Sequence, residues 1–163
     1  HVTLIRHAKP GGPTSGSTRD IDRPLNHRGE RDAPRMATHL RHQGFLPELI
    51  LCSPATRAAT TAEEIARGIG YDIDRILWKD QIYAAAVDEL LELISTVGTE
   101  LSHNAMVGHN PSFTELANLL QSHPIDNIPT CGVVAIQFDV NDWADVPATP
   151  GNLLCFDTPK SLK

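Results

Sequence analysis

Short apolar runs alternate along this chain with longer stretches in which apolar residues recur every three or four positions. The runs at 2–5, 49–52, 73–78 and 105–107 have the length and composition of buried β-strands. The longer stretches between them have the spacing of amphipathic helices. Strands that alternate with helices pair in parallel, because each helix carries the chain back across the sheet. The pattern therefore predicts an α/β fold with a mostly parallel sheet.

The first predicted helix follows a stretch at 11–22 that is rich in Gly, Pro, Ser and Thr and predicts a loop over the end of the first strand. Asn26 is a good N-cap for this helix, and Gly44 ends it. Pro34 falls inside the helical pattern, where a proline costs ~3 kcal/mol. We therefore expect this helix to be kinked or to begin later than Asn26 suggests.

Two later helices share a predicted start, an N-cap residue followed by a proline in the first turn. Ser53-Pro54 provides it after the second strand, and the helix that follows is expected to end near Gly68 or Gly70. Asn110-Pro111 repeats the arrangement after the strand at 105–107. Between these two helices, Asp88 opens another amphipathic helix.

The last part of the chain predicts a different strand arrangement. Apolar runs at 133–138 and 153–156 are joined by a polar loop at 141–151 that is too short for a crossover helix. The two runs therefore predict an antiparallel hairpin at the C-terminal edge of the sheet. Neither a repeat nor a linker interrupts the chain, so we expect one domain that spans 1–163.

Charge and cysteine content narrow the class of protein. The 163-residue chain has a formal net charge of −6, which disfavours nucleic acids and anionic membrane surfaces as partners. The sequence contains no apolar run of membrane-spanning length. Cys52, Cys131 and Cys155 are odd in number and form no Cys-x-x-Cys pair, which favours a reduced, cytoplasmic location.

Basic side chains follow three of the predicted parallel strands. Arg6 and His7 end the first strand, Arg57 lies in the first turn of the helix after the second, and His109 lies in the turn after 105–107. Each alone has an ordinary interpretation, as a surface arginine or a histidine bonded within its own turn. Because the carboxyl ends of parallel strands meet at one edge of a sheet, we expect the four groups to form a cationic cup.

Such a cup suits phosphoryl transfer. Guanidinium groups bind phosphate oxygens in bidentate fashion, and helix N-termini add backbone N–H groups. A neutral imidazole can attack phosphorus without a separate base, and a protonated one can stabilise the transferring group. The cations also supply the charge that Mg²⁺ provides in other phosphoryl-transfer sites, so we expect neither a metal nor a cofactor.

Four segments resemble the motifs of one family, in order and at plausible spacings. Val2–Ala8 resembles the Arg-His-Gly/Ala signature of the histidine phosphatase superfamily, which includes the phosphoglycerate mutases. Ser53–Ala58 is similar to the second motif, Val107–Pro111 to the third, and Arg23–Gly29 to the segment between the first two. The resemblance implies a three-layer α/β/α fold of the phosphoglycerate mutase type and a phosphatase with a histidine nucleophile.

The same resemblance implies roles for the four basic residues. His7 would be the phosphorylated nucleophile, and Arg6, Arg57 and His109 would form the phosphate pocket. Within the superfamily, the small size, the Arg-His-Ala-Lys start and the Arg-Pro-Leu segment resemble the short bacterial phosphohistidine phosphatases of the SixA type. The implied partner is a phosphorylated histidine-containing protein, such as a phosphorelay or phosphotransferase domain.

One departure from the larger members bears on the substrate. They place a glutamate general acid shortly after the third strand, roughly where 82–84 stands here, and SixA-type members lack it. The nearest carboxylates in this chain are Asp80 and Asp88. An imidazole leaving group is easily protonated, so phosphohistidine needs no strong dedicated acid. Asp20 or Asp22, on the loop after the first strand, could assist proton transfer.

Other classes of protein stay open. A small-molecule phosphomonoesterase of the same superfamily would need an acid for its alkoxide leaving group, and a mutase would also need insertions that retain the intermediate. A non-catalytic phosphate-binding or adaptor module would be favoured if His7 or Arg57 were replaced, and both are present. His39 and His42 are three apart on a predicted helix, but no cysteine or carboxylate cluster accompanies them, which disfavours a metal site.

Overall fold

One six-stranded sheet forms the centre of the computed structural model, which describes residues 1–12 and 19–162. The strands are β1 (Val2–Arg6), β2 (Leu49–Cys52), β3 (Leu77–Trp78), β4 (Asn104–Gly108), β5 (Val133–Gln137) and β6 (Asn152–Asp157). Their order across the sheet is β3-β2-β4-β1-β5-β6. The pairs from β3 to β1 are parallel, whereas β5 and β6 join antiparallel. The predicted mostly parallel sheet with an antiparallel C-terminal edge is confirmed.

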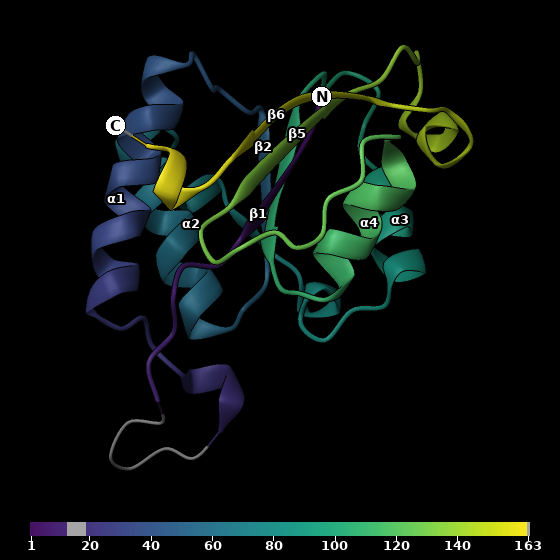
Figure 1. The fold of residues 1–163 in the computed structure, drawn as a ribbon. Helices are drawn as coiled ribbons and strands as arrows, with labels where there is room; N and C mark the ends of the chain where they lie inside the picture. Colours follow the sequence, from purple (N-terminus) through teal and green to yellow (C-terminus); the bar gives the residue numbers. More distant parts are fainter. Residues whose placement is uncertain (13–18, 163) are drawn as a thin grey trace.

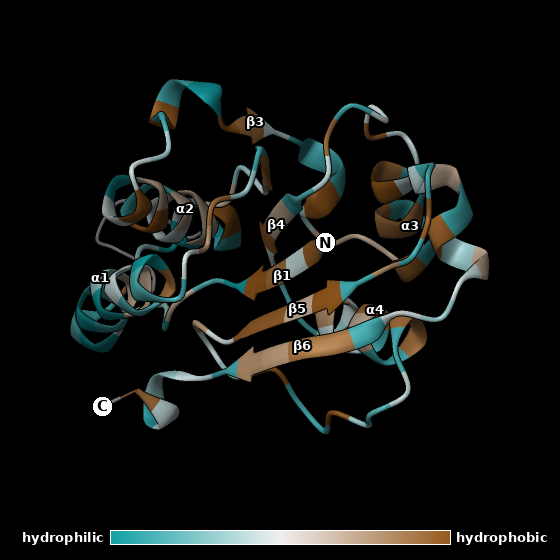
Figure 2. Cartoon of the chain, turned by 90° about the horizontal axis from the view of Figure 1, so that it is seen from above, coloured by the Kyte–Doolittle hydropathy of each residue, from teal (hydrophilic) through white to brown (hydrophobic). Residues whose placement is uncertain are grey.

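Helices cover both faces of this sheet. They are α1 (His27–His42), α2 (Thr56–Ile69), α3 (Val87–Ser95) and α4 (Ser112–Leu120). The first two lie on one side of the strands and the last two on the other (Figure 1). Seen from above, the largely apolar strands run between the two helical layers (Figure 2). The predicted three-layer α/β/α architecture is therefore confirmed.

The two faces have cores of different character. Beneath α1 and α2 many of the buried side chains are small, such as Ala37 and Ala62, and this lets the two helices pack closely. Beneath α3 and α4 the core contains larger groups, including Leu90, Met106 and Phe113. Fully burying one such side chain contributes ~1.5–3 kcal/mol. The strands are thus held from both sides, and the residues at their ends have fixed positions.

Of the two expectations for the first helix, a kink or a late start, the late start is wrong. α1 begins at His27 and runs through Pro34, so Asn26 is its N-cap as its sequence position suggested. The Asn26 Oδ1 atom accepts a hydrogen bond of 2.9 Å from the Gly29 N–H. Met36 is fully buried, and α1 packs along α2, so tertiary contacts outweigh the cost of the interior proline.

The predicted cap of the second helix is also wrong. α2 begins at Thr56, not at Pro54, and Ser53 lies outside it. The Ser53 Oγ atom accepts a hydrogen bond from the Ala55 N–H at 3.2 Å, which closes a turn before the helix. The helix ends at Ile69, close to the predicted end, because Gly70 caps it in the left-handed conformation with φ of 82°.

The later helices begin within two residues of their predicted starts. α3 starts at Val87 instead of Asp88, and α4 starts at Ser112 instead of Pro111. The Asn110 side chain still bonds the first turn of α4, because its Oδ1 atom accepts from the Thr114 N–H at 3.2 Å. This contact keeps the turn after β4 close to the helix.

Part of the predicted strand at 73–78 is a short 3-10 helix, η2 (Ile73–Arg75), and only Leu77–Trp78 forms β3. The Asp72 carboxylate accepts a hydrogen bond from the Asp74 N–H, and this turn replaces extended backbone. In the predicted loop at 11–22, residues 13–18 lie outside those described. Asp20–Asp22 forms another 3-10 helix, η1.

Three further 3-10 helices complete the described structure: η3 (Asp80–Ile82), η4 (Trp143–Ala148) and η5 (Pro159–Ser161). Among the described helices, none combines the length and the apolar character needed to cross a bilayer.

Candidate active site

The candidate site lies where three neighbouring strands, β2, β4 and β1, end at the same edge of the sheet. Arg6 is paired with Gly108, and Cys52 is paired with Val107, so the chain leaves all three strands at nearly the same level. A side chain on Gly108 would come within 2.6 Å of the Phe113 ring, which explains the glycine just before His109. The geometry brings the predicted strand-end residues to one place.

His7 is buried, with 6% of its surface exposed. Its Nδ1 atom lies 2.8 Å from the backbone oxygen of Ala8. A carbonyl oxygen can only accept, so Nδ1 carries the proton and Nε2 keeps a free electron pair. Burial, followed by the charges of Arg57 and Arg6, lowers the pKa of His7 to about 4. The ring is therefore neutral near pH 7, as a nucleophile must be.

His109 faces His7 across the site, with the ring centroids 5.1 Å apart. Its Nε2 atom lies 2.8 Å from the Oγ atom of Ser53, the residue that the sequence placed in a helix cap. Burial, followed by the charges of His7 and Arg57, lowers the pKa of His109 to about 3. Its Nδ1 atom is buried and has no hydrogen-bond partner among the described residues.

One nitrogen of the Arg6 guanidinium has a hydrogen-bond partner, and another nitrogen has none. Its Nη1 atom donates a hydrogen bond of 2.8 Å to the backbone oxygen of Ile128, which also accepts from the Asn110 side chain. Its Nε atom is buried, and within 1–12 and 19–162 it has no partner. An unsatisfied buried donor costs ~1–3 kcal/mol. An oxyanion bound here would relieve that cost on Arg6.

Arg57, in the first turn of α2, is held by the loop that follows β1. Its Nη1 atom donates to the backbone oxygen of Asp20 at 2.8 Å, and its Nη2 atom donates to the Asp20 carboxylate at 2.9 Å. The Arg57 side chain is 9% exposed and that of Asp20 is 50% exposed. The cation that the sequence placed at a helix N-terminus is thus paired with an anion from a distant segment.

The Asp20 carboxylate also contacts two residues that the sequence analysis did not assign to the site. Tyr83 donates its hydroxyl hydrogen to this carboxylate at 2.7 Å, and Arg23 donates at 3.2 Å. The hydrogen bonds from Tyr83, Arg57 and Arg23 hold the pKa of Asp20 at about 2. Asp22 lies instead beside Arg19, at 3.2 Å. In this arrangement the ionised Asp20 carboxylate accepts hydrogen bonds and has no proton to donate.

Ser53, Tyr83 and Arg23 were missed for different reasons. Ser53 was assigned to a helix cap, although its hydroxyl meets His109. Tyr83 stands where larger members carry their acid, and only the fold brings its ring beside His109, with centroids 5.5 Å apart. Arg23 lies in the segment that resembles the family between its first two motifs, but nothing in the local sequence indicates that it bonds Asp20.

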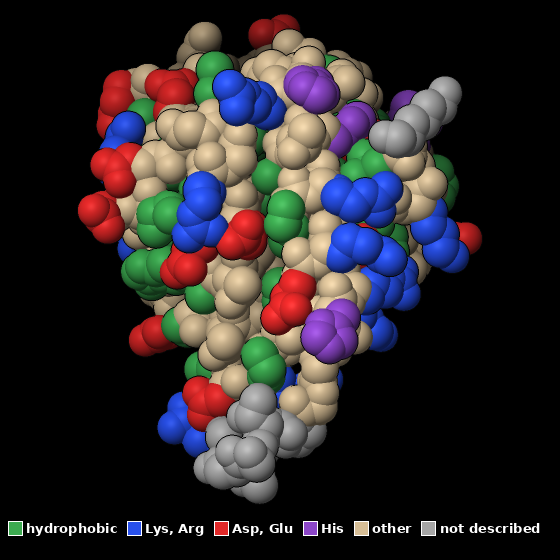
Figure 3. Space-filling model, turned by 90° about the vertical axis from the view of Figure 1, so that its left-hand side faces the viewer, with side chains coloured by type: hydrophobic (Ala, Val, Ile, Leu, Met, Phe, Trp, Pro, Cys, Tyr) green, Lys and Arg blue, Asp and Glu red, His purple; other side chains and the backbone are tan. Residues whose placement is uncertain are grey.

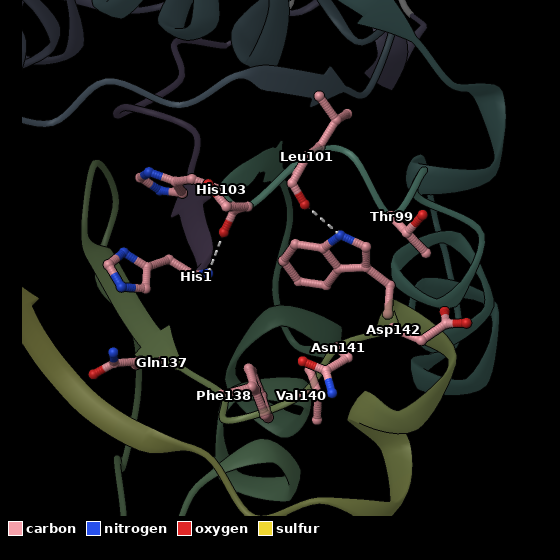
Figure 4. A pocket seen from close by; sticks show the side chains of 11 residues that line it. His1, Thr99, Leu101, His103, Gln137, Phe138, Val140, Asn141 and Asp142 are labelled. Atoms are coloured by element: carbon pink, nitrogen blue, oxygen red, sulfur yellow. Dashed lines mark hydrogen bonds between the residues drawn. The ribbon is translucent and has the colours of Figure 1, made fainter.

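A cavity of about 400 Å³ lies away from this site. It is lined by residues just before β4 and by residues between the end of β5 and the start of η4. Its lining includes Leu101, Phe138 and Trp143, and the Trp143 indole donates a hydrogen bond of 2.8 Å to the Leu101 oxygen (Figure 4). None of the four predicted strand-end residues lines it.

Among the described residues, no group of three or more His, Cys, Asp or Glu side chains is placed to hold a metal ion.

Comparisons with known proteins show which family the chain belongs to. The model of the histidine phosphatase superfamily (branch 1) matches residues 2–79. An uncharacterized chloroplastic protein of Arabidopsis thaliana is 32% identical over 92% of this chain and 72% of its own length. This chain belongs to the histidine phosphatase superfamily. It is accordingly a phosphatase, a hydrolase with a histidine nucleophile.

Other relatives match this histidine phosphatase over nearly its full length. The uncharacterized protein Rv1276c of Mycobacterium tuberculosis is 31% identical over 96% of this chain and 100% of its own. Among solved structures, the candidate phosphohistidine phosphatase SixA of Agrobacterium tumefaciens is 29% identical, with a TM-score of 0.79 and 97% of each chain covered. A protein histidine phosphatase SixA complexed with tungstate is 20% identical and shares the fold, with a TM-score of 0.83 over 99% of each chain.

The low pKa values of the two site histidines can be tested by NMR titration. Without ligand, we expect His7 to titrate near pH 4 and His109 near pH 3. Vanadate should raise the pKa of His109, because a bound oxyanion stabilises the imidazolium form. Protonation of either ring favours the unfolded chain, so stability should fall as the pH is lowered from about 6.5 to about 4 for His7 and to about 3 for His109. Titration of either ring near 6.5 in the ligand-free enzyme would contradict the buried, cationic site.

Proposed function

We propose that this enzyme hydrolyses phosphohistidine in proteins, with His7 as the residue that carries the phosphoryl group. The Nε2 atom of His7 attacks phosphorus, the P–N bond of the substrate breaks, and the departing imidazole takes up a proton. Water then attacks phospho-His7, which releases inorganic phosphate and restores the neutral ring. The hydrogen bond from Nδ1 to Ala8 supports this role, because it directs the free electron pair to Nε2.

The other residues of the cup would bind the phosphoryl oxygens. Arg6 offers its buried Nε–H, and Arg57 offers a cation in the first turn of α2. When Ser53 donates its hydroxyl hydrogen to Nε2 of His109, the Nδ1 atom of that ring carries a proton and can donate to an oxyanion. The unpartnered nitrogens of Arg6 and His109 are in place before substrate arrives, and donors held in this way stabilise developing charge at low cost.

The observation that carries the choice of substrate is the state of Asp20. Its pKa of about 2 leaves it ionised, and it accepts a hydrogen bond from Tyr83 instead of offering a proton. An alkoxide leaving group needs a general acid, whereas the imidazole of phosphohistidine is readily protonated. The names of the SixA structures, which describe phosphohistidine phosphatases, support the same substrate class.

One contact favours a second candidate, a small-molecule phosphomonoesterase. The Asp20 carboxylate reaches Tyr83, which stands where larger members of the superfamily carry their glutamate acid. If substrate binding draws Arg57 away from Asp20, the pKa of this carboxylate rises and a proton donor becomes available. Asp20, instead of a residue after β3, would then serve as the acid.

A comparison of leaving groups separates the two candidates. We expect kcat/KM for a phosphohistidine protein to exceed that for phosphoserine and for an alkyl phosphomonoester, because only the imidazole departs without a dedicated acid. Asp20→Asn should leave phosphohistidine turnover largely intact, with Asp22→Asn as the matched control on the same loop. Efficient turnover of the alkyl ester that is lost in Asp20→Asn would instead identify a phosphomonoesterase with Asp20 as its acid.

A further inference from the structure

We propose that a basic groove beside the active site docks an acidic surface segment of the phosphoprotein. The groove has a volume of about 360 Å³. Its apolar lining includes Pro129, Phe156 and Pro159, and it carries the cations Arg28 and Lys160. None of the described residues that line it is acidic. This inference rests on the proposed function, because it concerns how a protein substrate is held.

The groove shares a wall with the active site. The segment at 127–130 lines the groove on one side, and its Ile128 oxygen accepts the hydrogen bond from Arg6 on the other. Asn127, which lines the groove, also accepts a hydrogen bond of 2.9 Å from the side chain of Asn110, next to His109. A protein whose phosphohistidine reaches His7 would therefore lay its neighbouring surface along the groove.

The two cations come from elements that pack together. Arg28 is in the first turn of α1, and Lys160 is in η5, which contacts α1. Figure 1 shows the C-terminal turn beside this helix. The contact brings positive charge from both ends of the sequence to one groove.

Further positive charge surrounds Arg28. The buried carboxylate of Asp32 is shared by three guanidinium groups, from Arg28 at 3.5 Å, Arg31 at 3.1 Å and Arg35 at 3.6 Å. One carboxylate neutralises only one of these cations, and the three arginine side chains are 44–62% exposed. Figure 3 shows Lys and Arg side chains gathered on one side of the face that α1 covers.

The chemistry of the groove favours a protein segment as its occupant. The chain as a whole has a net charge of −6, so a local concentration of cations marks a surface for an acidic partner. The groove combines these cations with proline and phenylalanine side chains. A segment that mixes carboxylates with apolar side chains matches both features, and complementary charge would raise the rate of encounter.

The test compares a protein substrate with a small one. The protein substrate is a phosphohistidine transfer domain with carboxylates around its phosphohistidine, and the small one is N-phosphoimidazole. Lys160→Glu should lower kcat/KM for the protein roughly fivefold, and Arg28→Gln/Lys160→Glu at least about tenfold, with a weaker salt dependence. Turnover of N-phosphoimidazole should be unchanged. Arg41→Glu, which makes the same charge change near the other end of α1, should leave both substrates unaffected.

Arg28 pairs with Asp32, so its substitution can disturb α1, whereas Lys160 is exposed and tests the groove alone. Neutralising the carboxylates of the transfer domain should remove the difference between Lys160→Glu and the wild type. If both variants hydrolyse the acidic phosphoprotein as well as the wild type does, the docking proposal is wrong while the proposed function stands. If the wild-type enzyme hydrolyses no phosphohistidine substrate, the proposed function fails and the docking proposal falls with it.

Discussion

His7→Ala should abolish hydrolysis, with turnover at least about 1,000-fold below that of the wild type, because the variant loses the neutral ring whose Nδ1 contact with Ala8 leaves Nε2 free to attack phosphorus. The wild-type enzyme, mixed briefly with substrate and quenched in alkali, should carry phosphate on His7. Mass spectrometry of the peptide that contains His7 measures this directly, and the variant should show no such adduct.

His27→Ala is the matched control for this experiment. The side chain of His27 is fully exposed at the start of α1, so its loss should change neither turnover nor phosphate transfer. Circular dichroism and thermal unfolding of His7→Ala would separate a chemical defect from a folding defect. A well-folded His7→Ala enzyme with undiminished turnover would end the proposal of a covalent intermediate on this residue.

Arg57→Ala should weaken binding of phosphate or vanadate by about 1.5–3 kcal/mol, which corresponds to roughly 10- to 150-fold in Kd. The guanidinium supplies a charge-assisted contact that no neighbouring side chain in α2 replaces. Stability of the ligand-free enzyme should change little, because the half-exposed Asp20 carboxylate that loses its partner can turn to water. Isothermal titration and thermal unfolding measure the two effects separately.

Arg67→Ala provides the comparison for Arg57. Arg67 lies on the same helix and forms an exposed ion pair with Glu64, so its removal should leave oxyanion affinity as it is. Equal affinities for vanadate in the wild type and in Arg57→Ala would show that Arg57 serves only to hold the loop through Asp20. The predicted four-residue cup would then be incorrect.

The site residues at the ends of strands could be predicted because local patterns place them. A short apolar run followed by Arg6-His7 indicates a strand end, and the parallel topology brings such ends to one edge. The apolar pattern and the parallel topology also predicted the strands and the helices on both faces of the sheet. In α1 the prediction failed because packing against a distant segment, α2, carries the helix through Pro34, whereas at 73–78 a local turn at Asp72 replaces part of the strand.

The ion pair between Asp20 and Arg57 shows why the rest of the site could not be predicted. Asp20 was noted as a loop carboxylate that could move protons, and nothing near it in sequence points to an arginine 37 residues away. The hydroxyl of Tyr83 comes from another element again, 63 residues beyond Asp20. These contacts depend on how side chains from three separate segments are oriented, which the alternation of apolar and polar residues does not encode.

The position of β1 within the sheet has a consequence for how the enzyme is made. β1 is synthesised before the other described strands of this sheet, yet its two neighbours are β4 and β5, so both of its edges pair with residues more than one hundred positions later. At ~5–20 residues per second, a ribosome needs on the order of ten seconds to add that stretch. During this interval the segment that contains His7 lacks both of its partner strands, and the edge that carries the candidate site can assemble only after β4 and β5 have been made.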